Sequence, residues 1–168
     1  MIDIAQTFLD KSRDLLLSDY LPKIECCLER LSDEDLWWRP NAVSNSIGNL
    51  VLHLCGNITQ WVIGGVGGTD VRRDRQREFD ERGPLPGAEM QGRIRAVIGE
   101  AAEVIAGVDV ASLLTRRHIQ GYDVTALEAI YHAVEHCSMH TGQIILITKM
   151  RTGEDLRLWE PPAASTPA

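Results

Sequence analysis

The order of apolar and polar positions predicts a long helix at the start of the chain. Residues 2–31 place charged side chains on one face and apolar side chains on the other, the latter being Ile4, Phe8, Leu15, Leu16, Ile24, Leu28 and Leu31. Pro22 lies within this segment. Because proline lacks an N–H and its ring clashes with the carbonyl four residues back, we expect the helix to be kinked or divided there. Ser32, followed by three acidic residues, predicts a capped helical turn before Trp38.

A second helix is predicted after the loop that ends near Asn45. Ser44, Asn45 or Ser46 can cap it, and it runs through Trp61 until the glycines at 64, 65, 67 and 68 end it. The following residues, 70–83, are rich in charge and contain few apolar anchors. We therefore expect an exposed connection there, with room for a single turn of helix.

Two further helices complete the pattern. Residues 88–108 are amphipathic and close near Gly107, and a long connection follows that could be extended around residues 115–121. Thr125 is a plausible cap for the last helix, which continues to about Met150. Apolar residues occupy most faces of this helix, as is typical of a helix at the centre of a fold.

Together these segments predict an all-α fold, a four-helix bundle with long connections after its second and third helices. Residues 1–160 are expected to form one domain and residues 161–168 a disordered tail. Because 44% of the residues are hydrophobic, the chain can bury a core without disulfides or metal staples. The four cysteines lack paired metal-ligand spacing, so we interpret them as reduced thiols.

The distribution of charge along the chain limits the kinds of partner that it can bind. Lys and Arg number 17 against 24 Asp and Glu, a net charge of −7 that argues against a phosphate-binding surface and hence against nucleic acid. The stretch 41–69 has no charged residue, yet its asparagines, His53 and Gln60 make it a poor membrane span, so no membrane association is expected. An acidic start, without a basic and apolar leader, favours the cytoplasm.

Histidines supply the candidate chemistry. Of five in the chain, His132, His136 and His140 stand four residues apart on the last helix. Neighbours at this spacing can share a metal ion, but the outer two are about 12 Å apart along the axis. A further ligand must come from elsewhere, and His53 is the candidate, with Asn49 and Asn57 one turn to either side as hydrogen-bonding partners. The alternative is a set of hydrogen-bonded core histidines. His118 lies in a charged connection and is interpreted as solvated.

Two stretches resemble the DinB/YfiT-like family. The segment Tyr131-His-Ala-Val-Glu-His-Cys-Ser-Met-His-Thr-Gly-Gln-Ile144 is similar to its fourth-helix signature, and Leu36–Pro40 with Asn45–Leu54 is similar to the loop and helix that carry its first histidine. The resemblance implies a bundle that is commonly a homodimer, with a divalent metal ion on His53, His136 and His140. His132 matches no ligand position, which suggests a pocket wall or a contact to one of the metal ligands. The implied activities are thiol-dependent transferases and isomerases, although many members have no established reaction.

Three neutral imidazoles leave a divalent ion its full charge and an open position, as in catalytic zinc sites. Zinc or nickel is expected first, and iron or manganese also accept such ligands. A small-molecule substrate would meet Trp38, Arg39, Asn49, Asn57 and His132. The leading hypothesis is transfer of a low-molecular-weight thiol co-substrate to a small electrophile. A metal-dependent hydrolase, a non-catalytic metal-binding stress protein and a structural histidine cluster remain alternatives, because no residue stands out as a general base.

Overall fold

The computed structural model describes residues 4–159 and is mostly helical, which confirms the coarse fold class predicted from the apolar pattern. The predicted tail at residues 161–168 lies outside the described residues. The first helical segment divides at the predicted place, into α1 (Ile4–Asp14), the π-helical turn η1 (Leu15–Tyr20) and α2 (Leu21–Leu28). Pro22 lies in the first turn of α2, where its missing N–H costs least.

The other helices follow the predicted order, including the short helical turns expected after Ser32 and within residues 70–83. A short α3 (Asp33–Leu36) precedes α4 (Ile47–Ile58), which continues into the π-helical turn η2 (Thr59–Gly64). Next come α5 (Arg75–Asp80), α6 (Gly87–Ala106) and the 3-10 turn η3 (Val110–Ser112). The last helix, α7 (Ala126–Thr152), ends at Gly153, whose φ of 70° is the left-handed conformation of a helix C-terminus.

A β-hairpin corrects the all-α prediction. Strand β1 (Arg116–Ile119) pairs antiparallel with β2 (Tyr122–Thr125), in the register Arg116 to Thr125 and Ile119 to Tyr122. Gln120 and Gly121 form the turn with φ of 53° and 85°, the signs that a two-residue hairpin turn requires. The strands are four residues long and largely exposed, so they carry almost no apolar alternation from which they could have been predicted.

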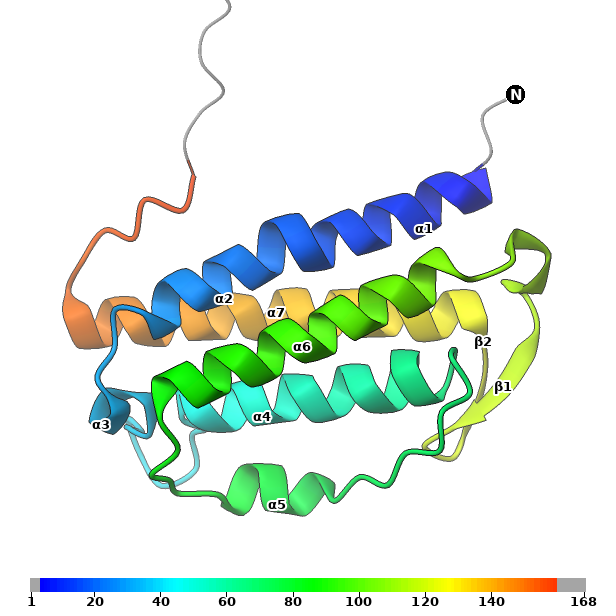
Figure 1. Cartoon of the computed structure of the whole chain (residues 1–168). Coiled ribbons are helices and arrows are strands. Elements are labelled where there is room, and N and C mark those ends of the chain that lie inside the picture. The colour runs from blue at the N-terminus through cyan, green and yellow to red at the C-terminus, as the bar shows by residue number, and fades with distance from the viewer. Residues whose placement is uncertain (1–3, 160–168) are drawn as a thin grey trace, which may run out of the picture.

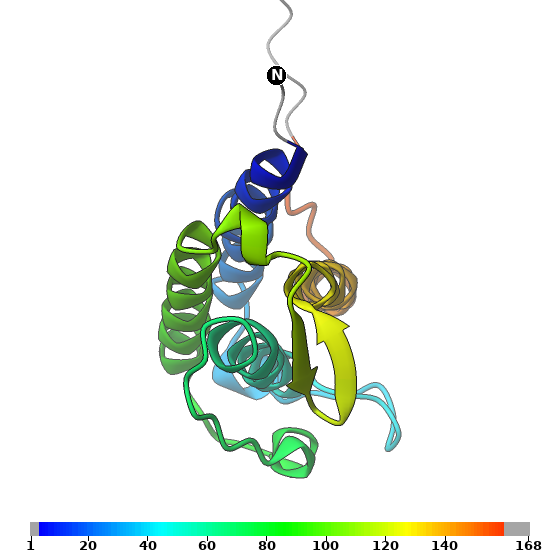
Figure 2. The same ribbon diagram turned by 90° about the vertical axis from the view of Figure 1, so that its right-hand side faces the viewer.

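The long helices lie side by side around one apolar core (Figure 1). Seen end-on, α1 and α2 face α4 across the core, with α6 on one flank and α7 on the other (Figure 2). α5 lies outside α4, and the hairpin lies beside the ends of α4 and α7. Fully buried side chains fill the centre, among them Leu16, Ile24, Leu54, Ile58, Met90, Ile94, Ile98 and Ile130.

Glycine lets the hairpin approach the second long helix. A Cβ atom on Gly65 would lie 2.3 Å from Ile119 Cδ1, so only glycine permits this contact. Ile119 is thereby buried, and the hairpin tip is held over the end of η2. No helix in the described part of the chain is long and apolar enough to cross a membrane.

Candidate metal centre

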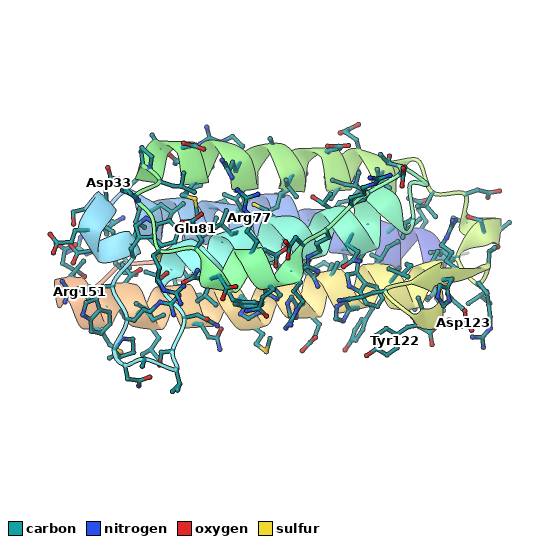
Figure 3. The ribbon with its side chains drawn as sticks, turned by 90° about the horizontal axis from the view of Figure 1, so that it is seen from below. Asp33, Arg77, Glu81, Tyr122, Asp123 and Arg151 are labelled. Atoms are coloured by element: carbon teal, nitrogen blue, oxygen red, sulfur yellow. The ribbon has the colours of Figure 1, made fainter. Side chains whose placement is uncertain are left out.

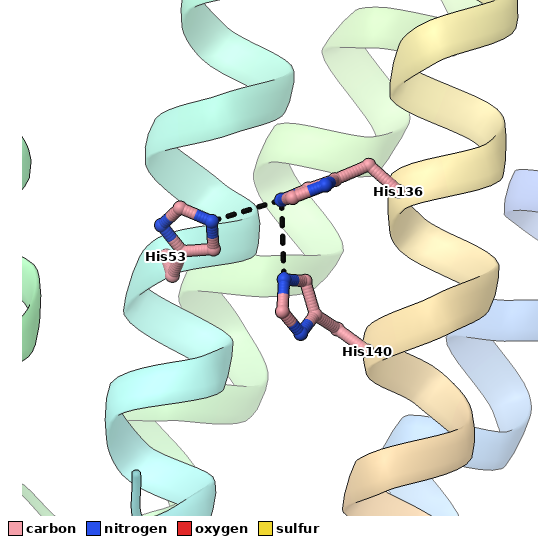
Figure 4. Close-up of side chains that lie close together, drawn as sticks. All are labelled: His53, His136 and His140. Atoms are coloured by element: carbon pink, nitrogen blue, oxygen red, sulfur yellow. Dashed lines mark hydrogen bonds between the residues drawn. The ribbon is translucent and has the colours of Figure 1, made fainter. Parts of the chain in front are cut away.

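Three histidines converge between α4 and α7. His53 Nε2 lies 2.8 Å from His136 Nε2, and His140 Nε2 lies 3.1 Å from the same atom (Figure 4). Candidate ligand atoms of the three residues all lie within 4.8 Å of one another. His53 and His140 are buried, whereas His136 is half-buried. These are the three residues that the resemblance assigns as metal ligands.

Helix capping sets the register of both helices that carry the histidines. Ser46 and Asn49 form a capping box at the start of α4, two turns before His53. Thr125 and Glu128 form the same motif at the start of α7. Because His136 and His140 are one turn apart on α7, both rings project toward α4.

Outer partners orient two of the rings. His140 Nδ1 lies 2.6 Å from Gln143 Oε1, and His53 Nδ1 lies 2.9 Å from Glu78 Oε2. Both partner oxygens are acceptors, so we assign the Nδ1–H tautomer to these two histidines; Arg73 Nη2, which also lies 3.1 Å from His53 Nδ1, donates to Glu78 Oε2 at the shorter distance of 2.7 Å. Each then directs a lone pair on Nε2 toward the centre, the orientation typical of metal-bound imidazole.

The proton count at the centre fits a cation. His136 Nε2 carries at most one hydrogen while neutral, yet it faces the lone pairs of both His53 and His140. With His53 and His140 in the assigned tautomer, one of the two short N–N contacts lacks a hydrogen. A divalent ion bound to three imidazole nitrogens satisfies all three lone pairs, so the donor set fits a metal such as zinc.

The electrostatic environment keeps the imidazoles of His136 and His140 neutral. Burial, with further contributions from His140 and His53, lowers the pKa of His136 to about 3. Burial likewise lowers the pKa of His140, partly opposed by its hydrogen bond with Gln143. Neutral imidazole is the form that binds metal. His136 and His140 are thus in the required protonation state near neutral pH.

A buried ion pair supports His53 from outside the bundle. Arg73 Nε donates to Glu78 Oε1 at 2.6 Å, and Arg73 Nη2 donates to Glu78 Oε2 at 2.7 Å. Burial alone would raise the pKa of Glu78, but the hydrogen bonds from Arg73 and His53 outweigh it and lower the pKa. Both side chains are about nine-tenths buried or more, with 6% and 11% exposed. Glu78 is therefore a charged acceptor for His53.

Residues 70–83 form the mostly exposed connection that was expected, and the Arg73–Glu78 pair is the part of it that packs against α4. Sequence reasoning missed both residues because they stand among eight other charged positions without a distinguishing pattern. Gly56 is the one signal, since it stands three residues after His53 on the face that the pair covers. A Cβ atom there would lie 1.9 Å from Glu78 Oε1 and 2.7 Å from Arg73 Nε.

A cavity of about 620 Å³ opens beside the histidines. Its lining includes His53 and His136 and two of the predicted pocket residues, Asn57 and His132. The connection after α4 and the β-hairpin contribute further side chains. His132 stacks against Trp61 with 4.2 Å between ring centroids, and its Nε2 lies 3.3 Å from Asn57 Nδ2. The cavity is thus continuous with the three-histidine centre.

Three other predicted pocket residues lie away from this cavity. Asn49 caps α4 and binds the carbonyl oxygens of Glu78 and Glu81, while its Oδ1 accepts from Arg39 at 2.6 Å. Trp38 stacks on the guanidinium of Arg151 at the opposite end of the bundle. Asn49 and Arg39 anchor a loop, and Trp38 packs against Arg151. The sequence alone does not distinguish such contacts from contacts with a substrate.

The remaining candidate groups do not join the centre. His118 is exposed and pairs with Asp123 at 2.8 Å. All four cysteines are free thiols, as expected. Burial raises the pKa of Cys55 and of Cys137 to about 12, which leaves both unreactive at neutral pH.

Comparison with known families and structures places the chain. A family model described as "Protein of unknown function (DUF1572)" matches residues 3–163. The chain belongs to this family. The family is DinB-like, which confirms the resemblance seen in the sequence. A crystal structure of a DinB-like protein from Bacillus cereus ATCC 10987 is similar, with a TM-score of 0.64 and 15% identity over 80% of this chain and 87% of that one. No curated protein matches the chain.

Proposed function

We propose that this DUF1572 protein binds one divalent metal ion through His53, His136 and His140 and uses it to act on a small molecule in the adjoining cavity. The observation that carries the proposal is the meeting of three imidazole nitrogens at the edge of that cavity. Zinc or nickel is the expected ion, with iron or manganese as alternatives. When bound, such an ion supplies Lewis-acid chemistry.

The chain's own residues prepare the site for that chemistry. Glu78 and Gln143 hold two of the rings with their Nε2 lone pairs inward. Trp61 and His132 form an aromatic wall of the cavity beside His136. These contacts fix the ligands before a metal or substrate arrives, which reduces the ordering cost of binding.

For the reaction, we propose transfer of a low-molecular-weight thiol to a small electrophile. The family resemblance supports this substrate class, and the size of the cavity accommodates a small molecule. Buried Cys55 and Cys137 are poor nucleophiles, so the thiol would be a co-substrate and not a side chain. A hydrolase and a non-catalytic metal-binding protein are the competing outcomes of the test below.

The test measures the metal content of variants first and the turnover of metal-loaded protein second. Replacing His53, His136 or His140 by Ala should each abolish stoichiometric metal in elemental analysis, because two imidazoles hold a divalent ion far less tightly than three. His118→Ala is the matched control and should retain one metal per chain, as should His132→Ala. Loss of metal in His132→Ala with retention in His140→Ala would show that the ligand set is wrong.

Protein loaded with each metal is then incubated with bacillithiol, mycothiol, glutathione or cysteine and a chlorinated aromatic acceptor. Thiol consumption that disappears in His136→Ala supports the transferase. Ester or amide hydrolysis without thiol consumption would favour the hydrolase. Full metal occupancy without thiol binding in calorimetry or turnover of either kind would favour a non-catalytic metal-binding protein.

We also propose that the protein forms a homodimer through α7. One stripe of this helix exposes four large apolar side chains by 47–62%, namely Tyr131, Met139, Leu146 and Met150. Their spacing of eight, seven and four residues puts them on one face of the helix. A two-fold axis across this stripe would pair it with the same stripe of a second copy, as an isologous interface requires.

A further inference from the structure

The charged side chains that line the cavity beside the histidines differ in whether they already have a partner within the protein. Arg73 is neutralised by Glu78 and also donates to Gln60 Oε1 at 2.9 Å. Glu128, the acidic residue of the lining, accepts through Oε2 from both the N–H and the hydroxyl of Thr125. These two charges are engaged within the protein, so neither defines what the cavity binds.

Arg75 is the cation of the lining whose charge is not neutralised. Its guanidinium lies 4.9 Å from the centroid of the Phe79 ring, and Phe79 in turn packs against His53 at 4.7 Å. Among the ion pairs formed by residues 4–159, none includes Arg75. The stacking contact therefore places a free positive charge at the rim, one aromatic ring away from the candidate metal ligand.

Gln120 contributes a second donor from the hairpin tip. Its φ of 53° is unusual for a residue with a side chain, and such a conformation persists only where surrounding contacts support it. One such contact is with Trp61, whose Nε1 donates to Gln120 Oε1 at 3.2 Å. Since the carbonyl end of the amide is taken by Trp61, the end that faces a ligand is the NH₂ donor.

We infer that the cavity binds a small organic molecule that carries a carboxylate, held by Arg75 and the Gln120 amide. A guanidinium without an ion-pair partner and an amide NH₂ group, both in the lining of one cavity, are donors that suit the oxygens of a carboxylate. The apolar part of the ligand would lie along Trp61 and Tyr122, whose rings are 6.3 Å apart and both line the cavity. Tyr122 is exposed at the hairpin end of the bundle (Figure 3).

The positive charge of Arg75 is opposite in sign to the net charge of the chain. The net charge is −7, so a free arginine at a cavity is not a consequence of a basic surface. The inference deepens the proposed function, because it names the substrate class of the same cavity. It depends on the proposal that the cavity is the substrate site, but its test does not require a bound metal.

The experiment measures binding of phenylacetate and of its neutral analogue phenylacetamide by calorimetry. Both the purified protein and chelator-treated protein are used, since a carboxylate can also bind a metal directly. We expect phenylacetate to bind the chelator-treated protein at least several-fold more tightly than phenylacetamide. Arg75→Gln should weaken phenylacetate binding about tenfold, the effect of losing a hydrogen bond to a charged group, and leave phenylacetamide unchanged.

Matched variants make the result specific. Arg77→Gln removes the same charge from α5 at an exposed position outside this cavity and should change binding less than twofold (Figure 3). Gln120→Glu keeps an oxygen for Trp61 but replaces the donor with a carboxylate, so phenylacetate binding should fall. Circular dichroism checks that each variant is folded.

Equal binding of the two probes, no measurable binding of phenylacetate, or equal losses in Arg75→Gln and Arg77→Gln would each overturn the inference. Metal content is measured on the same samples. One metal per chain without carboxylate preference would overturn this inference and leave the metal proposal standing. Arg75-dependent carboxylate binding without metal uptake would support this inference and contradict the metal proposal.

Discussion

Glu78 determines the tautomer of His53, and this single contact connects an outlying connection to the centre of the bundle. Its carboxylate is held in place by Arg73, accepts from His53 Nδ1 and lies against the backbone of α4 at Gly56. A charged acceptor makes an imidazole a stronger ligand and fixes its ring. Glu78 is thus a positioning residue for the candidate metal centre.

We predict that Glu78→Gln weakens metal binding about 10- to 100-fold, the usual cost of losing a carboxylate partner of a metal-bound histidine. Competition with a fluorescent chelator measures the affinity. Glu81→Gln, on the same connection, keeps an oxygen for the Gly83 N–H and should leave affinity unchanged. If the two variants bind metal equally well, Glu78 does not support the ligand.

At the scale of elements, α5 and the residues before it are docked on α4 by a close approach that only glycine allows. The gap at Gly56 is too small for a methyl group, whereas Gly92 on the exposed side of α6 has nothing within 4 Å. Both glycines lie in helix interiors, where alanine is otherwise favoured. The two positions therefore separate helix propensity from the docking of the Arg73–Glu78 pair.

We predict that Gly92→Ala raises the free energy of unfolding by about 0.5–1 kcal/mol, the difference in helix propensity. Gly56→Ala should instead lower it and also reduce metal affinity, because the added Cβ displaces Glu78 from His53. Urea unfolding and a metal titration of both variants check this. A stabilised Gly56→Ala protein with unchanged metal affinity would contradict the docking argument.

A second link between elements joins α3 to the end of α7. Asp35 accepts from Arg151 Nε at 2.9 Å and also from Arg151 Nη2. The hydrogen bond from Arg151, followed by that from Ser32, lowers the pKa of Asp35. A carboxyl with a lowered folded-state pKa stabilises the fold above its unfolded-state pKa, and the contribution disappears as the pH falls through the folded value.

We predict that Asp35→Asn lowers the free energy of unfolding by about 0.5 kcal/mol at pH 7, as for other partly exposed ion pairs. The difference from the unmodified protein should decrease below about pH 4 and vanish at lower pH. Chemical unfolding at several pH values measures it. Glu34→Gln on the same helix is the control, and a pH-independent difference for Asp35→Asn would exclude the ion pair as its cause.

At the scale of the whole molecule, the proposed homodimer rests on the exposed apolar stripe of α7. This helix borders the core with one face, carries the histidines of the centre and presents Tyr131, Met139, Leu146 and Met150 outward. Leu146 is more than half exposed, so a charged residue there does not disturb the core. The stripe can therefore be altered without unfolding the protein.

We predict that the protein elutes as a dimer and that Leu146→Lys shifts it to the monomer, because the two-fold axis would place two new charges against each other. Light scattering coupled to size exclusion gives the mass. Leu114→Lys, at an exposed apolar position before the hairpin, is the control and should remain dimeric. A monomeric unmodified protein at high micromolar concentration would contradict the dimer.

The sequence by itself determined the long helices and the spacing of the histidines on the last one, because these depend on local periodicity; the choice of His53, His136 and His140 as a set came from the family resemblance. A period near 3.6 predicts an amphipathic helix, and positions four apart on α7 necessarily share a face. The DinB-like resemblance rested on the same local motifs. Helix α4 begins at Ser46, one of the three caps considered, for the same reason.

Only the tertiary structure decided which polar residues surround the histidines. Arg73 and Glu78 contact His53, and Arg75 lies at the rim of the cavity, because a connection folds back over α4. No periodic pattern in the sequence relates these residues to His53. Gln120 reaches the cavity through a hairpin of four-residue strands with little apolar alternation. Asn49 and Arg39, by contrast, looked equally polar in sequence but anchor a loop. Contacts between distant segments follow from packing, which local spacing does not encode.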